Sequence, residues 1–472
     1  METWRIITLI VDWIWAVGII CWLYRNRKKL GRVYYWTLIT IIPTVAGYFT
    51  YRACISQWYR YHLTMPIKEQ YAINQRITPN EYVDDFSEIC SMIKRHYKLA
   101  DTKGISLERL KEECEKEIKE AQNNREYCLA LQKYFAGLKN MHTSIIYNTY
   151  IAFASAEWRK DSLYVTVNKT GLPFSIGDKI LSVDGMEVHH WKKKMRKYVT
   201  ASTDKARAYM TAKFIFTSYT DTVRTLRISH NDSIFTVAVP LNESTKKEME
   251  RGEKAANNKE YLEIRKKETR TPHYVEMLTL GDFSHLSAGR FIKNYTLVRH
   301  SKNLILDLVN NVGGLKINAE RIASLLIKKP YKRNDGKEIT PDSLAFKGKL
   351  YVMIGPGTSS AAEYLANILK ETGSAILVGD ETGGDFGTTP LKFRTSHDTY
   401  FTIGTGVPRR TLLGNLTEGV GVSPDIKITE KSNESNFRNT FLRVLNMVLS
   451  DKIKQLENYS FTNYKIENNK TE

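Results

Sequence analysis

The 472-residue sequence predicts an α/β protein made of several units in series. Three observations carry this prediction. Two apolar segments open the chain, a β-rich stretch occupies its middle, and strands alternate with helices from residue 273 onward. We expect a membrane anchor (residues 1–65), a helical unit (66–145), a β-rich domain (146–241), a charged linker (242–272), an α/β core (273–430), and a C-terminal helix and tail (431–472).

The two apolar segments, Ile6–Tyr24 and Tyr34–Tyr51, are each long enough to form a transmembrane helix, which takes ~20 residues. The loop between them, Arg25–Arg32, is strongly basic, and by the positive-inside rule it lies in the cytoplasm. We therefore expect a chain anchored through a lipid bilayer, the cytoplasmic (inner) membrane of a bacterium, with its globular part in the periplasm. A cleaved signal peptide is the alternative for the first segment.

The formal net charge of +19 raises the question of a nucleic-acid partner. Part of this charge lies in the basic loop and part in residues 192–197, and no RNA- or DNA-binding motif accompanies either run. Residues 192–197 form either a solvated face or a contact with anionic lipid headgroups. The five cysteines form no Cys-x-x-Cys pair and have no histidine at zinc-site spacing. We expect no nucleic-acid partner and no structural metal.

Helical periodicity marks residues 78–138, where Phe86, Ile89 and Ile93 recur on one helix face and residues 107–118 and 127–138 repeat the pattern. This unit ends in LKNMHTSIIY, with His142 at the boundary between helix and strand. A lone histidine is usually structural, so its position alone does not establish a catalytic role.

The stretch 147–241 is rich in β-branched residues and predicts strands at 162–168, 179–183, 222–229 and 233–239. Within it, GLPFSIGDKILSVDGMEV (Gly171–Val188) resembles the hairpin of PDZ domains, which bind peptide C-termini by adding them as a strand to a sheet edge. No Gly-Leu-Gly-Phe-type carboxylate-binding loop precedes it.

The α/β core predicts strands at 274–280, 303–308, 350–354 and 375–379, a β-rich segment at 391–407, and a closing helix at 436–456. Its centre is LYVMIGPGTSSAAEYL, in which a strand and a Gly-rich turn lead to a Ser pair at the start of a helix. Unpaired N–H groups at a helix N-terminus favour a developing oxyanion. An ordinary helix cap is the alternative.

Four motifs taken together, LKNMHTS, LILDLVNNVGG, TSSAAE and EGVGVSPD, resemble the S41 peptidases, the family of tail-specific and tricorn-like proteases. The resemblance implies a ClpP/crotonase-like core that needs no metal or cofactor. It places the nucleophile at Ser360, with Ser359 as the nearest alternative. It assigns the oxyanion hole to the backbone of Ala361 and of Gly313 or Gly314.

The general base separates two branches of this family. In the tail-specific branch a Lys follows the nucleophile by 25 residues, and that position is Asp385 here, so a Ser–Lys dyad is not expected. The tricorn-like branch uses a His and a Glu, and the matching positions are His142 and Glu418. Thr143 is a candidate for a fourth member.

The resemblance therefore implies a serine endopeptidase that forms an acyl-enzyme and cleaves proteins or peptides, at exposed C-terminal tails. The two apolar segments, which lie outside the resemblance, predict that this enzyme is anchored in a membrane. The alternative is a membrane-tethered peptide-binding protein without turnover. The missing Lys motivates this second hypothesis.

Overall fold

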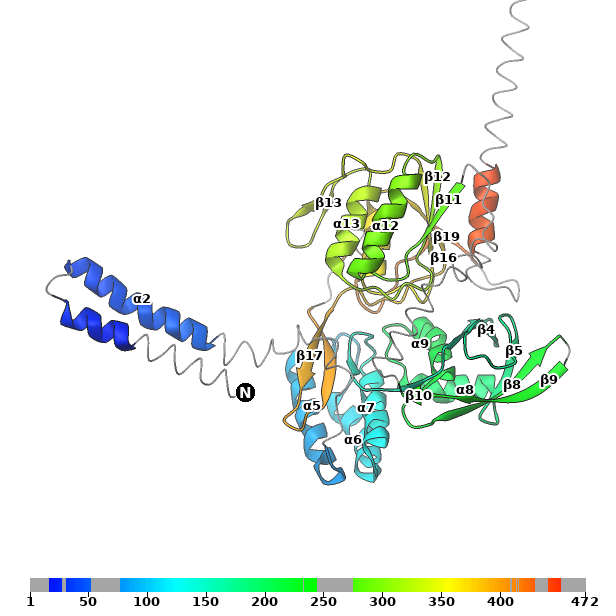
Figure 1. Cartoon of the computed structure of the whole chain (residues 1–472), viewed down its shortest axis with the longest axis horizontal. Helices are drawn as coiled ribbons and strands as arrows, with labels where there is room; N and C mark the ends of the chain where they lie inside the picture. Colours follow the sequence, from blue (N-terminus) through cyan, green and yellow to red (C-terminus); the bar gives the residue numbers. More distant parts are fainter. Residues whose placement is uncertain are drawn as a thin grey trace, which may run out of the picture.

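The computed structural model describes residues 17–27, 31–51, 77–231, 233–243, 275–407, 410–412, 414, 416–428 and 440–450 (Figure 1). Most of the expected charged linker and the C-terminal tail lie outside the described residues.

The N-terminal part contains a helix over residues 17–25 and α2 (Arg32–Tyr51). Of the helices that the structure describes, none is both long and apolar enough to span a bilayer. The 20 residues of α2 include Pro43 and several Thr and Tyr side chains, whose polar groups lower its apolar character. The prediction of two transmembrane helices, and of a bilayer contact through them, is not supported; residues 6–16 of the first segment lie outside the described residues.

The core contains a sheet of five parallel strands in the order β11-β12-β15-β16-β19. These strands are β11 (Val275–Thr279), β12 (Asn303–Asp307), β15 (Lys349–Ile354), β16 (Ile376–Gly379) and β19 (Ile426–Lys427). Their continuous apolar runs are typical of strands that are covered on both faces.

Helices cover this sheet on both sides (Figure 1). One face packs against α12 (His285–Val298), α13 (Lys316–Leu326) and α14 (Ala361–Glu371) in a single apolar cluster. The other face packs against the helix over residues 440–450, through Phe441, Val444 and Val448. A short hairpin of β13 (Tyr331–Lys332) and β14 (Glu338–Ile339) follows α13.

The helical unit consists of η2 (Pro79–Glu81), α5 (Tyr82–His96), α6 (Leu107–Glu120) and α7 (Asn124–Gly137). Its core also includes Phe393, Phe401 and Ile403, which come from the hairpin of β17 (Thr389–Arg394) and β18 (Tyr400–Thr405). The sequence assigned this hairpin to the α/β core, whereas the structure pairs β18 with β1 (Ser144–Ile145) beside the helices. Large aromatic side chains that complete the helical core explain the difference.

The β-rich unit has a sheet ordered β3-β4-β5-β8-β9, with β6 paired to β5. Its elements are β2 (Tyr150–Ile151), β3 (Ala154–Arg159), β4 (Ser162–Asn168), β5 (Lys179–Val183), β6 (Met186–Glu187), α8 (Val188–Met195), η3 (Arg196–Tyr198), α9 (Asp204–Met210), η4 (Thr211–Ile215), β7 (Thr217–Ser218), β8 (Val223–His230), β9 (Ser233–Pro240) and β10 (Asn242–Glu243). The β5–β6 hairpin lies where the PDZ-like phrase predicted one, while the PDZ assignment itself stays a prediction.

The β-rich unit contacts the α/β core through residues 202–209. The Lys205 ammonium pairs with the Asp380 carboxylate, and the Tyr209 hydroxyl donates to Asn310 Oδ1 at 2.6 Å. Three units therefore meet around the end of β15, where the chain turns into α14.

The first testable prediction concerns the β17–β18 hairpin. Phe401 is fully buried, with ring centroids 5.5 Å from Phe135 and 5.8 Å from Phe393. Phe401→Ala should lower the free energy of unfolding by about 3–5 kcal/mol, because it removes a large buried ring and leaves a cavity. Chemical denaturation measures this loss. Leu297→Ala is the control, since Leu297 is 80% exposed, and an equal loss in both variants would contradict the packing described.

Candidate active site

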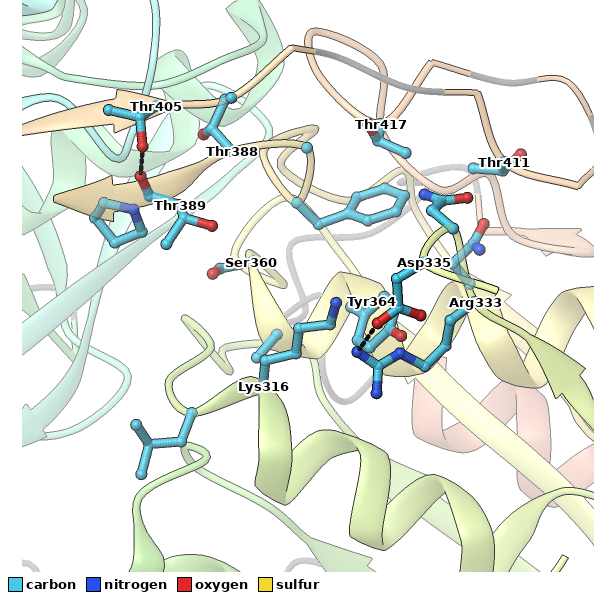
Figure 2. Close-up of a pocket in the computed structure, with 18 of the residues that line it drawn as sticks. Lys316, Arg333, Asp335, Ser360, Tyr364, Thr388, Thr389, Thr405, Thr411 and Thr417 are labelled. Carbon is cyan, nitrogen blue, oxygen red and sulfur yellow. Dashed lines mark hydrogen bonds and ion pairs between the residues drawn. The ribbon is translucent and has the colours of Figure 1, made fainter. Parts of the chain in front are cut away.

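Ser360 lies at the turn between β15 and α14, as the order of strand, glycines and helix predicted. Its backbone adopts φ 55° and ψ −120°, a conformation that costs a residue with a side chain about 1–3 kcal/mol. Apolar β15 on one side and the buried face of α14 on the other fix both ends of this turn. This turn places the half-buried Ser360 at the start of the helix, facing a pocket (Figure 2).

His142 approaches Ser360 from the helical unit. Its Nε2 lies 3.0 Å from Ser360 Oγ, across 218 positions of sequence. The turn after α7 that carries His142 is anchored by Thr143, whose hydroxyl donates to Asn140 Oδ1 at 2.8 Å and accepts from Gly404 N–H at 2.9 Å. Thr143, a candidate fourth member, thus holds the loop and has no contact with the imidazole among the hydrogen bonds of the described residues.

Thr388 occupies the other side of the imidazole. Its Oγ1 lies 2.9 Å from His142 Nδ1 and 3.4 Å from Asn140 Nδ2. If Nε2 is to accept the Ser360 proton, Nδ1 carries the ring proton and donates it to Thr388 Oγ1. Thr388 therefore fixes both the tautomer and the orientation of the base.

Glu418 does not contact His142 in the structure. Its Oε1 accepts hydrogen bonds from Asn140 Nδ2 at 3.0 Å, Ser202 Oγ at 2.8 Å and Lys103 Nζ at 2.6 Å. The Glu418 carboxylate is 1% exposed and the Lys103 side chain 10% exposed, so this ion pair is buried. Burial lowers the pKa of Lys103, and the adjacent Glu418 charge acts against this shift. Hydrogen bonds through Asn140 and Thr388 link Glu418 to His142.

Two backbone N–H groups are available for an oxyanion. The N–H of Ala361, at the first position of α14, has no acceptor among the described residues. Gly313 N–H is already bound to Asn311 Oδ1 at 2.8 Å. Phe283 exchanges hydrogen bonds with Gly313 O and Leu315 N–H, so the N–H of Gly314 points away from Phe283 and stays unpaired within the described chain. Of the two glycines, Gly314 is therefore the one whose N–H is free within the described chain to act as a second donor.

Glycine is required at position 313. A Cβ there would lie 2.7 Å from Ser360 Cβ and 2.9 Å from Ala361 N, at a φ of +99°. Any side chain would collide with the nucleophile turn, which explains the Gly-Gly pair on physical grounds.

A pocket of about 530 Å³ opens beside Ser360 (Figure 2). Aromatic and charged side chains line it: Tyr331, Tyr364, Phe386, Lys316, Arg333 and Asp335. The charged groups largely neutralise one another, because Arg333 pairs with Asp335 at 2.7 Å and with Glu320 at 3.1 Å. The pocket can receive one side chain of a peptide.

Three family models match this chain. The model described as "Peptidase family S41" matches residues 275–428, "Tricorn protease C1 domain" matches 78–136, and "Bacteroidetes, Peptidase, S41 family, N-terminal domain" matches 155–241. Along the chain the matched ranges correspond in turn to the helical unit, the β-rich unit and the α/β core seen in the structure. The chain belongs to peptidase family S41.

Curated relatives of this S41-family chain include a "Probable CtpA-like serine protease" of Staphylococcus epidermidis, 26% identical over 174 residues, which is 34% of this chain and 35% of the relative. A protein of the same description from Staphylococcus aureus (strain N315) is 28% identical over 168 residues, 33% of each chain. The chain thus spans about a third of the length of these relatives.

Among solved structures, that of mature CPAF complexed with lactacystin has a TM-score of 0.63 at 14% identity. It covers 80% of this chain and 99% of the CPAF chain. At this identity the likeness shows a shared fold, and it extends over most of the S41-family chain.

The structure brings together Ser360, His142, Ala361 and Gly314 of the residues predicted for the site. Glu418 is linked to His142 only through Asn140 and Thr388. Gly313 shapes the turn, and its own N–H is bound to Asn311. Ser359, the nearest alternative nucleophile, is fully buried, and its hydroxyl has no partner among the described residues. Sequence reasoning missed Thr388, Asn140 and Lys103; only Asn140 carried a signal, because it stands in the LKNMHTS motif.

The second testable prediction concerns Thr388 as a positioning residue. Thr388→Val keeps the shape but removes the acceptor for Nδ1–H, and hydrogen bonds to a charged group contribute about 1.5–3 kcal/mol. We expect kcat for peptide hydrolysis to fall roughly 10- to 100-fold, while KM changes little. Thr388→Ser, which keeps the hydroxyl, should retain most of the activity. Equal activity of the Val and Ser variants would show that Thr388 does not orient His142.

Proposed function

We propose that the chain is a serine endopeptidase that hydrolyses peptide bonds through an acyl-enzyme on Ser360. The contact that supports this most directly is the 3.0 Å distance between Ser360 Oγ and His142 Nε2, at a helix N-terminus with two unpaired N–H groups. A nucleophile, a base within hydrogen-bond reach and an oxyanion site are the three parts that acyl transfer needs.

In the first half-reaction His142 Nε2 takes the hydroxyl proton as Ser360 Oγ attacks the carbonyl carbon. The imidazolium then holds both protons, with Nδ1–H directed at Thr388 Oγ1. When the tetrahedral intermediate collapses, the C–N bond breaks and His142 gives its proton to the leaving amine. A water then repeats the sequence on the ester and restores the Ser360 hydroxyl.

The charge that develops on the substrate oxygen is bound by the N–H groups of Ala361 and Gly314. Because the turn is rigid, these donors need no reorganisation when the charge forms, and one such donor contributes a factor of about 10²–10³ in kcat. The Glu418 carboxylate stabilises the imidazolium at a distance, through Asn140 and Thr388.

The substrate class follows from the site and the family. We propose protein or peptide substrates that present an accessible segment, with one side chain in the pocket bounded by Tyr364 and Phe386. A preference for exposed C-terminal tails is the finer proposal. It rests on the S41 family and on the description of the curated relatives as CtpA-like serine proteases. A site of action outside the cytoplasm rests on the basic segment Arg25–Arg32 alone and stays a prediction.

The third testable prediction separates hydrolysis from binding. The purified full chain should be labelled covalently by a fluorophosphonate probe, and both labelling and peptide hydrolysis should fall at least about 10⁴-fold in Ser360→Ala and His142→Ala. Circular dichroism of each variant checks that the fold is intact. Ser359→Ala is the matched control and should be labelled normally. Peptide binding without labelling in the parent chain would favour the alternative, a peptide-binding protein without turnover.

The tail preference has its own measurement. A peptide library in which each sequence carries either a free or an amidated C-terminus should be cleaved faster in the free form. Equal rates for the two forms would retain the endopeptidase and remove the preference for tails.

A further inference from the structure

The carboxyl groups of Asp385 and Glu363 lie next to the backbone N–H of Ser360. Asp385 Oδ1 accepts the Ser360 N–H at 2.9 Å, and Glu363 Oε2 accepts the same N–H at 3.2 Å. Both side chains are buried, Asp385 at 1% and Glu363 at 0% exposure. Two ionised carboxylates so close together in a dry site repel each other strongly, so the pair is expected to hold one proton.

The hydrogen bonds around the pair are unequal. Glu363 accepts further bonds from the Thr382 hydroxyl at 2.5 Å, Gly384 N–H at 2.6 Å and Asp385 N–H at 2.8 Å. Asp385 Oδ2 is buried and has no partner among the described residues. The protein thus supplies more hydrogen-bond donors to Glu363 than to Asp385.

The surrounding charges come from four elements. The backbone of Asp385 pairs with that of Glu418, which places the Glu418 carboxylate nearby. Lys103, before α6, faces both Glu418 and Asp385, and Lys213 of η4 faces Asp385. His142 lies on the other side of Ser360. Burial, and next the Asp385 charge, raise the pKa of Glu363 well above its ordinary value.

We propose that Asp385 and Glu363 form a proton-sharing carboxyl pair that holds the strained Ser360 backbone in its reactive conformation. Asp385 is a positioning residue: it touches the Ser360 amide and neither the substrate nor the base. It stands 25 residues after Ser360, where the Ser–Lys branch of the family carries its base. In this chain the residue at that position, Asp385, accepts the Ser360 N–H, and His142 serves as the base. The proposal deepens the proposed function but can be tested without it.

The pair makes the site sensitive to rising pH. Because the folded pKa of Glu363 lies above its unfolded value, folding favours the protonated pair, and this stabilisation is complete below the unfolded pKa. As the pH rises through the folded pKa, a second negative charge is forced into the buried site and the stabilisation is lost. Both stability and the Ser360 geometry should then weaken.

The experiment compares Asp385→Asn with the parent full chain, in the active form and in a Ser360→Ala background. Asn keeps an acceptor for the Ser360 N–H and cannot ionise. In the Ser360→Ala background, the melting temperature of the Asp385→Asn variant relative to its parent should increase steadily from about pH 5 to about pH 9. Asp161→Asn, an exposed turn residue in the β-rich unit, controls for the loss of one negative charge and should show no such trend.

The second measurement is the rate of fluorophosphonate labelling against pH. Asp385→Asn should label at neutral pH within a few-fold of the parent and lose the parent's decline with rising pH, whereas Asp385→Ala should label about tenfold more slowly at every pH because the backbone strain is no longer supported. Superimposable pH profiles of melting temperature for parent and Asn variant would overturn the carboxyl pair. If no protein is labelled at all, the proposed function fails, and the melting series in the Ser360→Ala background still decides the pair.

Discussion

The hydrogen bond between Ser360 and His142 joins the α/β core to the helical unit, and the proposed active site needs residues from both. The α/β core carries the strained Ser360 and the unpaired N–H groups of Ala361 and Gly314, and the helical unit carries His142. Neither unit alone contains a nucleophile and its proton acceptor. The precision of the site therefore depends on how the units dock, and this docking rests on the β17–β18 hairpin, whose aromatic residues belong to the helical core while Thr388 beside it touches His142.

Charge balance explains why a histidine can serve as base here. Three buried acidic side chains, Glu363, Asp385 and Glu418, lie around the nucleophile turn, and Lys103 pairs with one of them. Burial lowers the pKa of the two lysines near these carboxylates, Lys103 and Lys213, while the charges of Glu418 and Asp385 act against that shift. Histidine can lose its proton more readily, and a cationic imidazolium is stabilised by the same carboxylates during the reaction.

The sequence was informative where a local rule applies. The parallel strands are continuous apolar runs, and the helix after Ser360 begins just after the glycines, so the position of Ser360 at the helix start and the Gly-Gly turn followed from local pattern and family motif. Thr388 could not be predicted, because a threonine in a Gly-rich loop carries no distinguishing pattern and gains its role only when β18 pairs with β1. Glu418 was identified by its motif, but its link through Asn140 depends on side-chain geometry that sequence does not encode locally. Of the two predicted membrane spans, α2 contains several Tyr and Thr residues that lower its apolar character, and residues 6–16 of the other lie outside the described part of the chain.

The β17–β18 hairpin packs in the core of the helical unit, and this packing also affects how the protein folds during synthesis. During synthesis the three helices leave the ribosome long before residues 389–405, yet their apolar core is completed by Phe393 and Phe401 from that late segment. Thr388 arrives in the same step, after both His142 and Ser360. A nascent chain therefore carries its serine without an oriented base until almost all of it has emerged. The order of the segments therefore makes the contact between Thr388 and His142 one of the last parts of the site to form.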